Sequence, residues 1–270
     1  MSHTYASVFD FKGYLIDGGD ASWTQSDTTI LTLLEGASRR IDEWCDRSRF
    51  GSGFGPRIGT NRYDAPAGAV LELEDDLLAI TSVSGVSGGG TVTLTENTDV
   101  YGLPYEPVPY RQLSLAWTGS KAWGSDQRGT IIVGTWGYSN ETYALATGGT
   151  LTSSATSLIL TGGSAYAGQT LLIDSEQLYV TASGGTATVV RGVNGTTAAT
   201  HAASAAVSAY RYPRDIVSAC LQLTGRRQRS AQAGLTGDFG GGIVPVGTFR
   251  DTESSILKSV IGTYRFVAAG

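Results

Sequence analysis

Residues 168–181 read GQTLLIDSEQLYVT, which is two runs of apolar and β-branched side chains on either side of a short polar turn. This pattern predicts strands at 169–174 and 177–181, since every second residue of a strand faces the same side. Three further short runs of this type lie at 157–161, 187–191 and 205–209. Together the five runs predict a small β module with turns between its strands.

The segment around these strands, residues 148–209, differs in composition from the rest of the chain. Forty of its 62 residues are Gly, Ala, Ser or Thr, and its only charged side chains are Asp174, Glu176 and Arg191. Its aliphatic side chains supply a possible core. We therefore expect a small all-β domain at 148–209, inserted in a host domain made of residues 1–147 and 210–270.

The host domain combines helical and strand patterns. Apolar residues recur at helical spacing over 26–47, 213–228 and about 251–264. An antiparallel sheet is predicted by short runs at 69–74, 77–83, 91–95, 112–117 and 129–136. The expected fold class is α+β: a helical core of about three helices, one N-terminal and two C-terminal, from which an antiparallel β-sheet and the inserted small all-β module project.

Composition and missing motifs exclude several function classes. No run of about 20 apolar residues occurs in the 270, so no membrane span or membrane partner is expected. Cys45 and Cys220 are few enough to suit synthesis in a reducing cytoplasm, and both lie on apolar helix stripes where burial is expected. Of the two histidines, His3 lies near the start of the chain, where mobility is common. Nucleotide, zinc and hydrolase motifs are lacking, so we expect no enzyme, no catalytic residue, no metal site and no cofactor.

Negative charge is concentrated in residues 64–106, which hold eight carboxylates and neither Lys nor Arg. Such a block repels DNA or pairs with a basic neighbour. Within it, the run Glu74, Asp75 and Asp76 raises the possibility of calcium binding, because hard cations take clustered carboxylates. The spacing of a calcium loop is absent, so a turn at the end of a strand is the simpler explanation.

Positive charge is concentrated in residues 211–229, which hold five arginines against one aspartate. Three of them, Arg226, Arg227 and Arg229, follow the second predicted helix to its end. There they suit the negative end of the helix dipole, and they are also candidates for contact with nucleic acid or with a partner.

Five segments occur in an order that is characteristic of one known family. They read TILTLLEGASRRID at 29–42, RYD at 62–64, LELEDDLLAITSV at 71–83, GTWGY at 134–138 and PRDIVSAC at 213–220. In this order they resemble the head-tail connector (adaptor, head-completion) proteins of tailed bacteriophages. With the third helix, the resemblance covers roughly residues 25–140 and 210–266.

The resemblance implies a virion structural protein of the phage neck. Its subunits would form a ring, probably a dodecamer, docked on the portal protein, extending the DNA channel and meeting the stopper or tail-completion protein. The apolar C-terminal segment, with Tyr264, Arg265, Phe266 and Val267, would then order on the portal. The opposite charge blocks, represented by Arg226, Arg227, Arg229, Glu74, Asp75 and Asp76, would face neighbouring subunits or the DNA that passes transiently through the channel.

A second resemblance concerns the β module. Residues 168–181, together with VRGVNGTTAATHA at 190–202, are similar to a β module that recurs in phage virion proteins. The polar residues on that pattern could form a cluster, for which turn and strand-pinning roles are a better explanation than catalysis. They are Asp174, Glu176, Arg191, Asn194 and His201.

Two other functions stay open. A carbohydrate-binding, adhesion or decoration protein of the virion is suggested by the Gly/Ser/Thr-rich module and by aromatic residues that could stack on sugars, namely Trp117, Trp123, Trp136 and Tyr138. A hydrolase that uses two carboxylates, for example Asp75 and Glu106, has no support from the spacing of its candidate residues.

Overall fold

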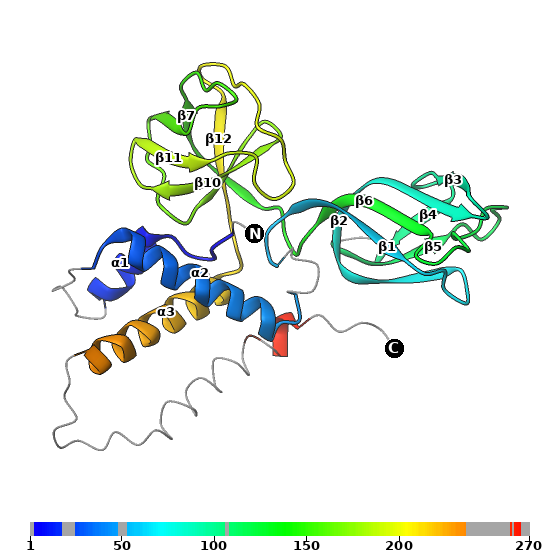
Figure 1. Ribbon diagram of the computed structural model, residues 1–270, viewed down its shortest axis with the longest axis horizontal. Helices are drawn as coiled ribbons and strands as arrows, with labels where there is room; N and C mark the ends of the chain where they lie inside the picture. Colours follow the sequence, from blue (N-terminus) through cyan, green and yellow to red (C-terminus); the bar gives the residue numbers. More distant parts are fainter. Residues whose placement is uncertain are drawn as a thin grey trace. The chain divides into compact units, whose positions relative to one another are not determined.

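The computed structural model describes residues 3–17, 25–47, 53–105, 108–235, 260 and 262–265, and the chain divides into two compact units (Figure 1). The first unit comprises the described residues of Met1–Asp46 and Glu141–Arg265, and it holds a closed β-barrel and three helices. The second comprises the described residues of Arg47–Asn140 and holds a six-stranded sheet.

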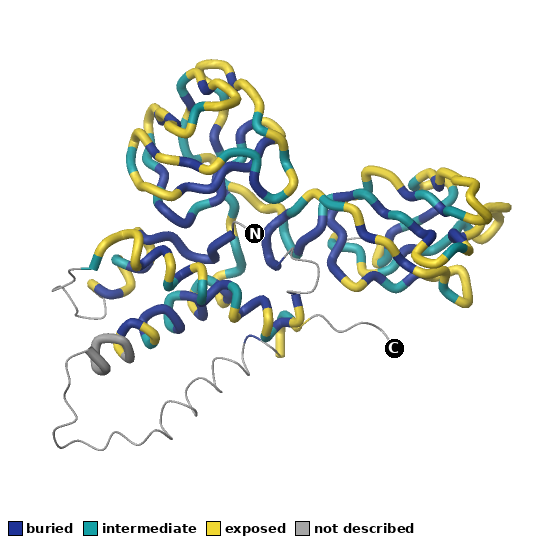
Figure 2. Tube along the Cα trace, viewed as in Figure 1, coloured by how far each residue is buried: buried dark blue, intermediate teal, exposed yellow. Residues whose placement is uncertain are grey.

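The barrel of the first unit closes six antiparallel strands in the order β10-β11-β8-β7-β12-β9. Apolar side chains fill its interior because every second residue of a strand faces inward. In β8, for example, Leu158 and Leu160 are buried between exposed neighbours, and Figure 2 shows this alternation along the strands. The strands are β7 (Thr142–Gly148), β8 (Ser157–Thr161), β9 (Thr170–Ile173), β10 (Glu176–Ala182), β11 (Thr186–Val190) and β12 (Ala206–Tyr210).

Three helices pack together beside the barrel, and they are α1 (Val8–Asp17), α2 (Asp27–Trp44) and α3 (Arg214–Leu235). Helix α2 begins after Ser26, whose hydroxyl accepts the N–H of Thr29, as capping residues do. Its apolar stripe lies against α3, where Cys220 is fully buried. On the barrel side, the hydroxyl of Tyr179 in β10 donates to Glu35 Oε1 of α2 at 2.8 Å.

Residues 3–8, here called the N-terminal strap, bind the barrel. The Nδ1 atom of His3 lies 3.1 Å from Thr170 Oγ1 of β9, and the N–H of Val8 donates to Ala167 O at 2.9 Å. The strap passes so close to Gly168 (φ +96°) that a methyl group there would come within 2.8 Å of Thr4 Oγ1. Only glycine fits this position without strain.

The same strap also binds α2. The N–H of Tyr5 donates to Ser38 Oγ at 3.1 Å, and the Tyr5 hydroxyl donates to the buried carboxylate of Asp42. Arg39 forms an ion pair with Asp42 at 3.1 Å and donates to the carbonyl oxygen of His3. The strap therefore joins the barrel to the helices through buried polar contacts.

The second unit is an antiparallel sheet in the order β1-β6-β2-β5-β4, with β3 paired to β2. Strand β2 is long enough to pair with β5 along its first part and with β6 and β3 along the rest. Ile132 and Trp136 of β6 are fully buried in the core of this unit. The strands are β1 (Arg57–Tyr63), β2 (Val70–Ser87), β3 (Gly90–Leu94), β4 (Val100–Leu103), β5 (Tyr110–Leu115) and β6 (Thr130–Trp136).

The expected fold class, α+β with a helical core from which the β elements project, is wrong. The described chain is mostly β, and the barrel and the sheet each enclose a hydrophobic core of their own. The physical reason is closure: alternating strands that wrap into a barrel bury their inward side chains against one another and need no helical core. The helices form only part of the first unit.

Individual elements also differ from the sequence predictions. The runs at 69–74 and 77–83 belong to one strand, β2, which passes through bulges. Sequence patterns did not indicate α1, β1, β4 or β7. The third helix is described only at Val260 and residues 262–264, which are helical, and the rest of 251–264 lies outside the described residues. The predicted domain limits at 148 and 209 stay a prediction; the strands that close the barrel extend from Thr142 to Tyr210.

Candidate functional site

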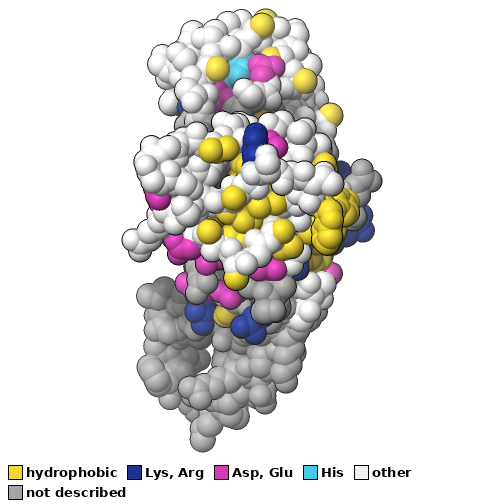
Figure 3. Space-filling model, turned by 90° about the vertical axis from the view of Figure 1, so that its right-hand side faces the viewer, with side chains coloured by type: hydrophobic (Ala, Val, Ile, Leu, Met, Phe, Trp, Pro, Cys, Tyr) yellow, Lys and Arg dark blue, Asp and Glu magenta, His cyan; other side chains and the backbone are white. Residues whose placement is uncertain are grey.

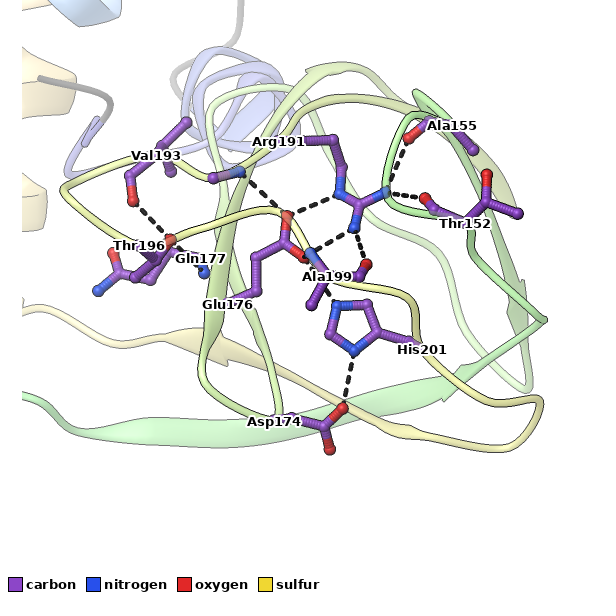
Figure 4. Close-up of polar contacts among 11 residues, drawn as sticks. Thr152, Ala155, Asp174, Glu176, Gln177, Arg191, Val193, Thr196, Ala199 and His201 are labelled. Atoms are coloured by element: carbon purple, nitrogen blue, oxygen red, sulfur yellow. Dashed lines mark hydrogen bonds and ion pairs between the residues drawn. The ribbon is translucent and has the colours of Figure 1, made fainter.

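A buried ion pair forms the centre of the polar cluster in the barrel (Figure 4). Glu176 begins β10, and Arg191 directly follows β11. Arg191 Nε donates to Glu176 Oε1 and Arg191 Nη2 to Glu176 Oε2, each at 2.7 Å. The side chains are 6% exposed for Arg191 and 0% for Glu176. Two parallel hydrogen bonds of this kind fix orientation as well as charge.

Histidine extends the cluster. His201 Nε2 lies 2.8 Å from Glu176 Oε2, and His201 Nδ1 lies 2.7 Å from Asp174 Oδ2. Both ring nitrogens of His201 therefore lie within hydrogen-bond distance of a carboxylate oxygen. His201 itself is buried, whereas Asp174 is exposed.

Backbone groups satisfy the remaining hydrogen-bonding capacity. Glu176 accepts the N–H of Gly192 at 3.0 Å and of Ala199 at 2.9 Å. Arg191 Nη1 donates to the carbonyl oxygens of Thr152 at 2.6 Å and Ala155 at 2.9 Å. The cluster thus ties two loops to the start of β10, and its polar atoms are used in doing so.

The pKa of Glu176 is lowered to about 2. Burial alone raises the pKa of a carboxyl group, but hydrogen bonds from Arg191, the N–H of Ala199 and His201 outweigh burial here. The carboxylate therefore stays charged over the whole range in which most carboxyl groups titrate. A proton-transfer group needs the opposite property, a pKa near the working pH.

Strand pinning is thus the role that the geometry of this cluster supports. The structure brings together Asp174, Glu176, Arg191 and His201, and it places Asn194 nearby, where Nδ2 donates to Gln177 Oε1 at 2.9 Å. Sequence reasoning had identified these residues. What it could not supply was the register that brings residues 176, 191 and 201 to one point.

The acidic run at 74–76 is split by the structure. Glu74 is exposed, whereas Asp75 and Asp76 are buried. Asp76 forms a buried ion pair with Arg47 and lies 3.1 Å from Arg111 Nε. Among the described residues, no group of three or more His, Cys, Asp or Glu side chains is placed to hold a metal ion. Asp76 therefore serves the interior of the second unit, and Glu74 alone of the three reaches the surface.

The three arginines that were predicted to face a neighbouring subunit or DNA, Arg226, Arg227 and Arg229, lie on α3. The Arg227 side chain packs against α2 at Gly36. A methyl group added to Gly36 would lie 2.8 Å from Arg227 Nη1. Arg226 and Arg229 line a small pocket of about 160 Å³ beside Tyr14. Tyr264 is half-buried and Arg265 exposed. The other two predicted portal contacts, Phe266 and Val267, and the acidic residue Glu106 lie outside the described residues.

Most of the aromatic residues considered for sugar stacking are structural. Trp123 Nε1 donates to Ala69 O and Trp136 Nε1 to Gly59 O, each at 3.0 Å. Trp117 is fully exposed after β5. Figure 3 shows hydrophobic side chains gathered on the face of the second unit that looks toward the viewer. Tyr138 packs against Phe54.

A cavity with a volume of about 520 Å³ lies within the first unit. It opens between the strap, the barrel and the start of α3. Sequence reasoning counted two of its arginines in the basic block but did not locate the cavity, because its walls come from three separate segments. Its lining includes Asp10, Tyr143, Gln169, Tyr210, Arg211 and Arg214.

The two cysteines behave as expected for small hydrophobic residues. Both are buried and free, and burial raises the pKa of the Cys220 thiol to about 11. None of the helices in the described part of the chain is long and apolar enough to cross a membrane.

The chain was compared with protein families, with curated proteins and with solved structures. No family model, no curated protein and no solved structure matches the chain.

Proposed function

We propose that the protein is a structural subunit of the neck of a tailed bacteriophage. In this role it is a head-tail adaptor: a ring of copies docks on the portal, extends the DNA channel and joins it to the stopper or tail. The role is one of assembly rather than catalysis.

The position of the five family-like segments carries the proposal. Three of them, at 62–64, 71–83 and 134–138, lie on β1, β2 and β6, which are neighbours in one sheet. The other two, at 29–42 and 213–220, lie on α2 and α3, which pack together. Segments that are far apart in the sequence thus lie side by side within each unit, as expected for pieces of a shared architecture.

The use of polar side chains also supports an assembly role. Each unit contains a buried ion pair, which is Glu176–Arg191 in the first unit and Asp76–Arg47 in the second. Meanwhile Arg229 and Glu74 remain at the surface, where charges of opposite sign suit the heterologous contacts of a ring.

Cryo-electron microscopy of virions assembled from the genome that encodes this chain tests the proposal. We expect a ring between the capsid vertex and the tail into which the barrel and the six-stranded sheet can be placed as separate bodies. Particles from a genome with a stop codon in this gene are the control, and they should be filled or empty heads without tails. Location of the chain on the capsid surface or on fibres contradicts the proposal and favours decoration or adhesion.

A further inference from the structure

The cavity of about 520 Å³ in the first unit has the size of a small-molecule site, for which roughly 300–1,000 Å³ is typical. Its walls combine the rings of Tyr143 and Tyr210 with the apolar side chains of Val217 and Leu221. Tyrosine rings offer flat apolar faces and a polar end, which suits a ligand that is itself part apolar and part polar.

The charge of the cavity favours an anion. Arg211 and Arg214 line it, and in the described part of the chain neither guanidinium has an ion-pair partner. Arg211 is already held in place, because its Cζ lies 5.5 Å from the centre of the Tyr143 ring. The one lining carboxylate, Asp10, accepts hydrogen bonds from the N–H and hydroxyl of Ser7.

Neutral hydrogen-bonding groups surround the two arginines. Gln169 Nε2 donates to the Tyr143 hydroxyl at 2.9 Å, which orients that phenol. Burial raises the pKa of Tyr210 to about 12, so its hydroxyl is a neutral donor at physiological pH. The cavity therefore presents two cations, oriented hydroxyl groups and aromatic faces within one space.

We propose that this cavity binds an acidic sugar of the hexuronate type. The carboxylate would pair with Arg211 and Arg214, the C–H face of the ring would lie on a tyrosine, and the sugar hydroxyls would meet the phenol and amide groups. This inference goes beyond the neck assignment and does not depend on it, because it concerns the described residues of the first unit alone.

Isothermal titration calorimetry with the full chain tests it, using D-glucuronate, D-glucose and acetate as probes. We expect saturable binding of glucuronate, with glucose and acetate at least tenfold weaker, since one lacks the charge and the other the ring. Arg211→Gln combined with Arg214→Gln should weaken glucuronate binding at least tenfold. Arg40→Gln, an exposed arginine of α2 outside the cavity, is the matched control and should bind as the parent does.

Several results would overturn the proposal. Glucuronate that fails to bind the parent, or binds the double variant equally well, removes the site. Equal affinity for acetate shows an anion site with no preference for sugar. Binding of a glutamate-rich peptide in place of glucuronate assigns the cavity to a segment of a partner protein. Circular dichroism confirms folding, and the single variant Arg214→Gln provides a milder change.

Discussion

At the level of single residues, the buried carboxylate of Glu176 stabilises the barrel through its ion pair and hydrogen bonds. It accepts hydrogen bonds from Nε and Nη2 of Arg191 and from two backbone N–H groups, and its Oε2 lies 2.8 Å from His201 Nε2. Removal of one member of a buried ion pair leaves its partner charged and unpaired, which typically costs about 3–5 kcal/mol. The cluster is therefore expected to dominate the pH dependence of the first unit.

We expect acid to destabilise the first unit between about pH 4.5 and pH 2. The pKa of Glu176 is about 2 in the folded protein and 4.5 in the unfolded chain. The folded state therefore binds fewer protons than the unfolded state in this pH range. The stabilisation is complete above pH 4.5 and is lost as the pH falls toward 2, with a total of about 3 kcal/mol. Urea unfolding followed by circular dichroism over this pH range measures it.

The matched variant is Glu176→Gln, which keeps the shape of the side chain and removes its titration. At pH 7 it should be less stable than the parent by about 3–5 kcal/mol, and its stability should change less between pH 4.5 and 2. Identical pH profiles for the two proteins would show that Glu176 is not the group responsible.

At the scale of elements, Gly134 shows why the centre of the sheet is tightly specified. It lies in β6 between β1 and β2, opposite Gly59 and Ile80. A methyl group at this position would come within 2.4 Å of the carbonyl oxygen of Ala79. No rotation of a side chain relieves contact with backbone, so the strands themselves would have to separate.

We therefore expect Gly134→Ala to destabilise the second unit by about 1–3 kcal/mol through overpacking. Gly13→Ala in α1 is the contrasting control, because nothing lies within 4 Å of the added methyl group. It should raise stability by up to about 1 kcal/mol, since alanine favours a helix over glycine. Thermal unfolding of both variants measures the difference, and an equal effect in the two would contradict the packing argument.

The N-terminal strap stabilises the first unit through the buried hydrogen bond from Tyr5 to Asp42. Tyr5→Phe removes the hydroxyl that donates to Asp42 while keeping the ring that packs on Tyr212. A buried acceptor that loses its donor costs about 1–3 kcal/mol, more where it is charged. Tyr14→Phe on α1 removes an exposed hydroxyl and should change stability by less than about 0.5 kcal/mol. Chemical denaturation compares them, and equal losses would assign no special role to the strap.

At the scale of the whole molecule, the chain leaves the first unit after Asp46 and returns to it at Glu141. The barrel core and the sheet core share no residue. A unit with its own hydrophobic core can fold without the other unit when a flexible linker takes the place of the removed residues.

We expect the first unit to fold when residues 47–140 are replaced by a flexible Gly/Ser linker. Dispersed amide signals in NMR and a cooperative thermal transition would show this. Leu178→Ala in the shortened chain is the control, because it opens a cavity in the barrel core and should cost about 2–5 kcal/mol. A shortened chain without cooperative unfolding would show that the first unit needs the second.

Local patterns were sufficient for many elements. The helix after Ser26 and the strands around residues 157–161, 170–173 and 176–182 begin and end close to where their periodicity predicts. Burial of Cys45 and Cys220 is confirmed as well. Each of these depends on neighbours three or four positions away, or on alternation within one strand, and both are visible in the chain itself.

Predictions failed where a residue's environment depends on contacts with residues distant in the sequence. His3, expected in a mobile terminus, is buried against Thr170 and Tyr212. Strands β1, β4 and β7 span only four to seven residues each, which is too short for their sequence to stand out from that of a loop. Similarly, nothing in the acidic run at 74–76 reveals that Asp76 meets Arg47.

Local sequence patterns were enough to indicate many of the helical and extended segments, the change of composition at 148–209 and the residues that could carry chemistry. Long-range contacts, in contrast, close the strands into a barrel and a separate sheet and bring Glu176, Arg191 and His201 together. The physical reason is that propensity and periodicity act over a few residues. Closure, register and the pairing of buried charges depend instead on contacts between residues tens of positions apart.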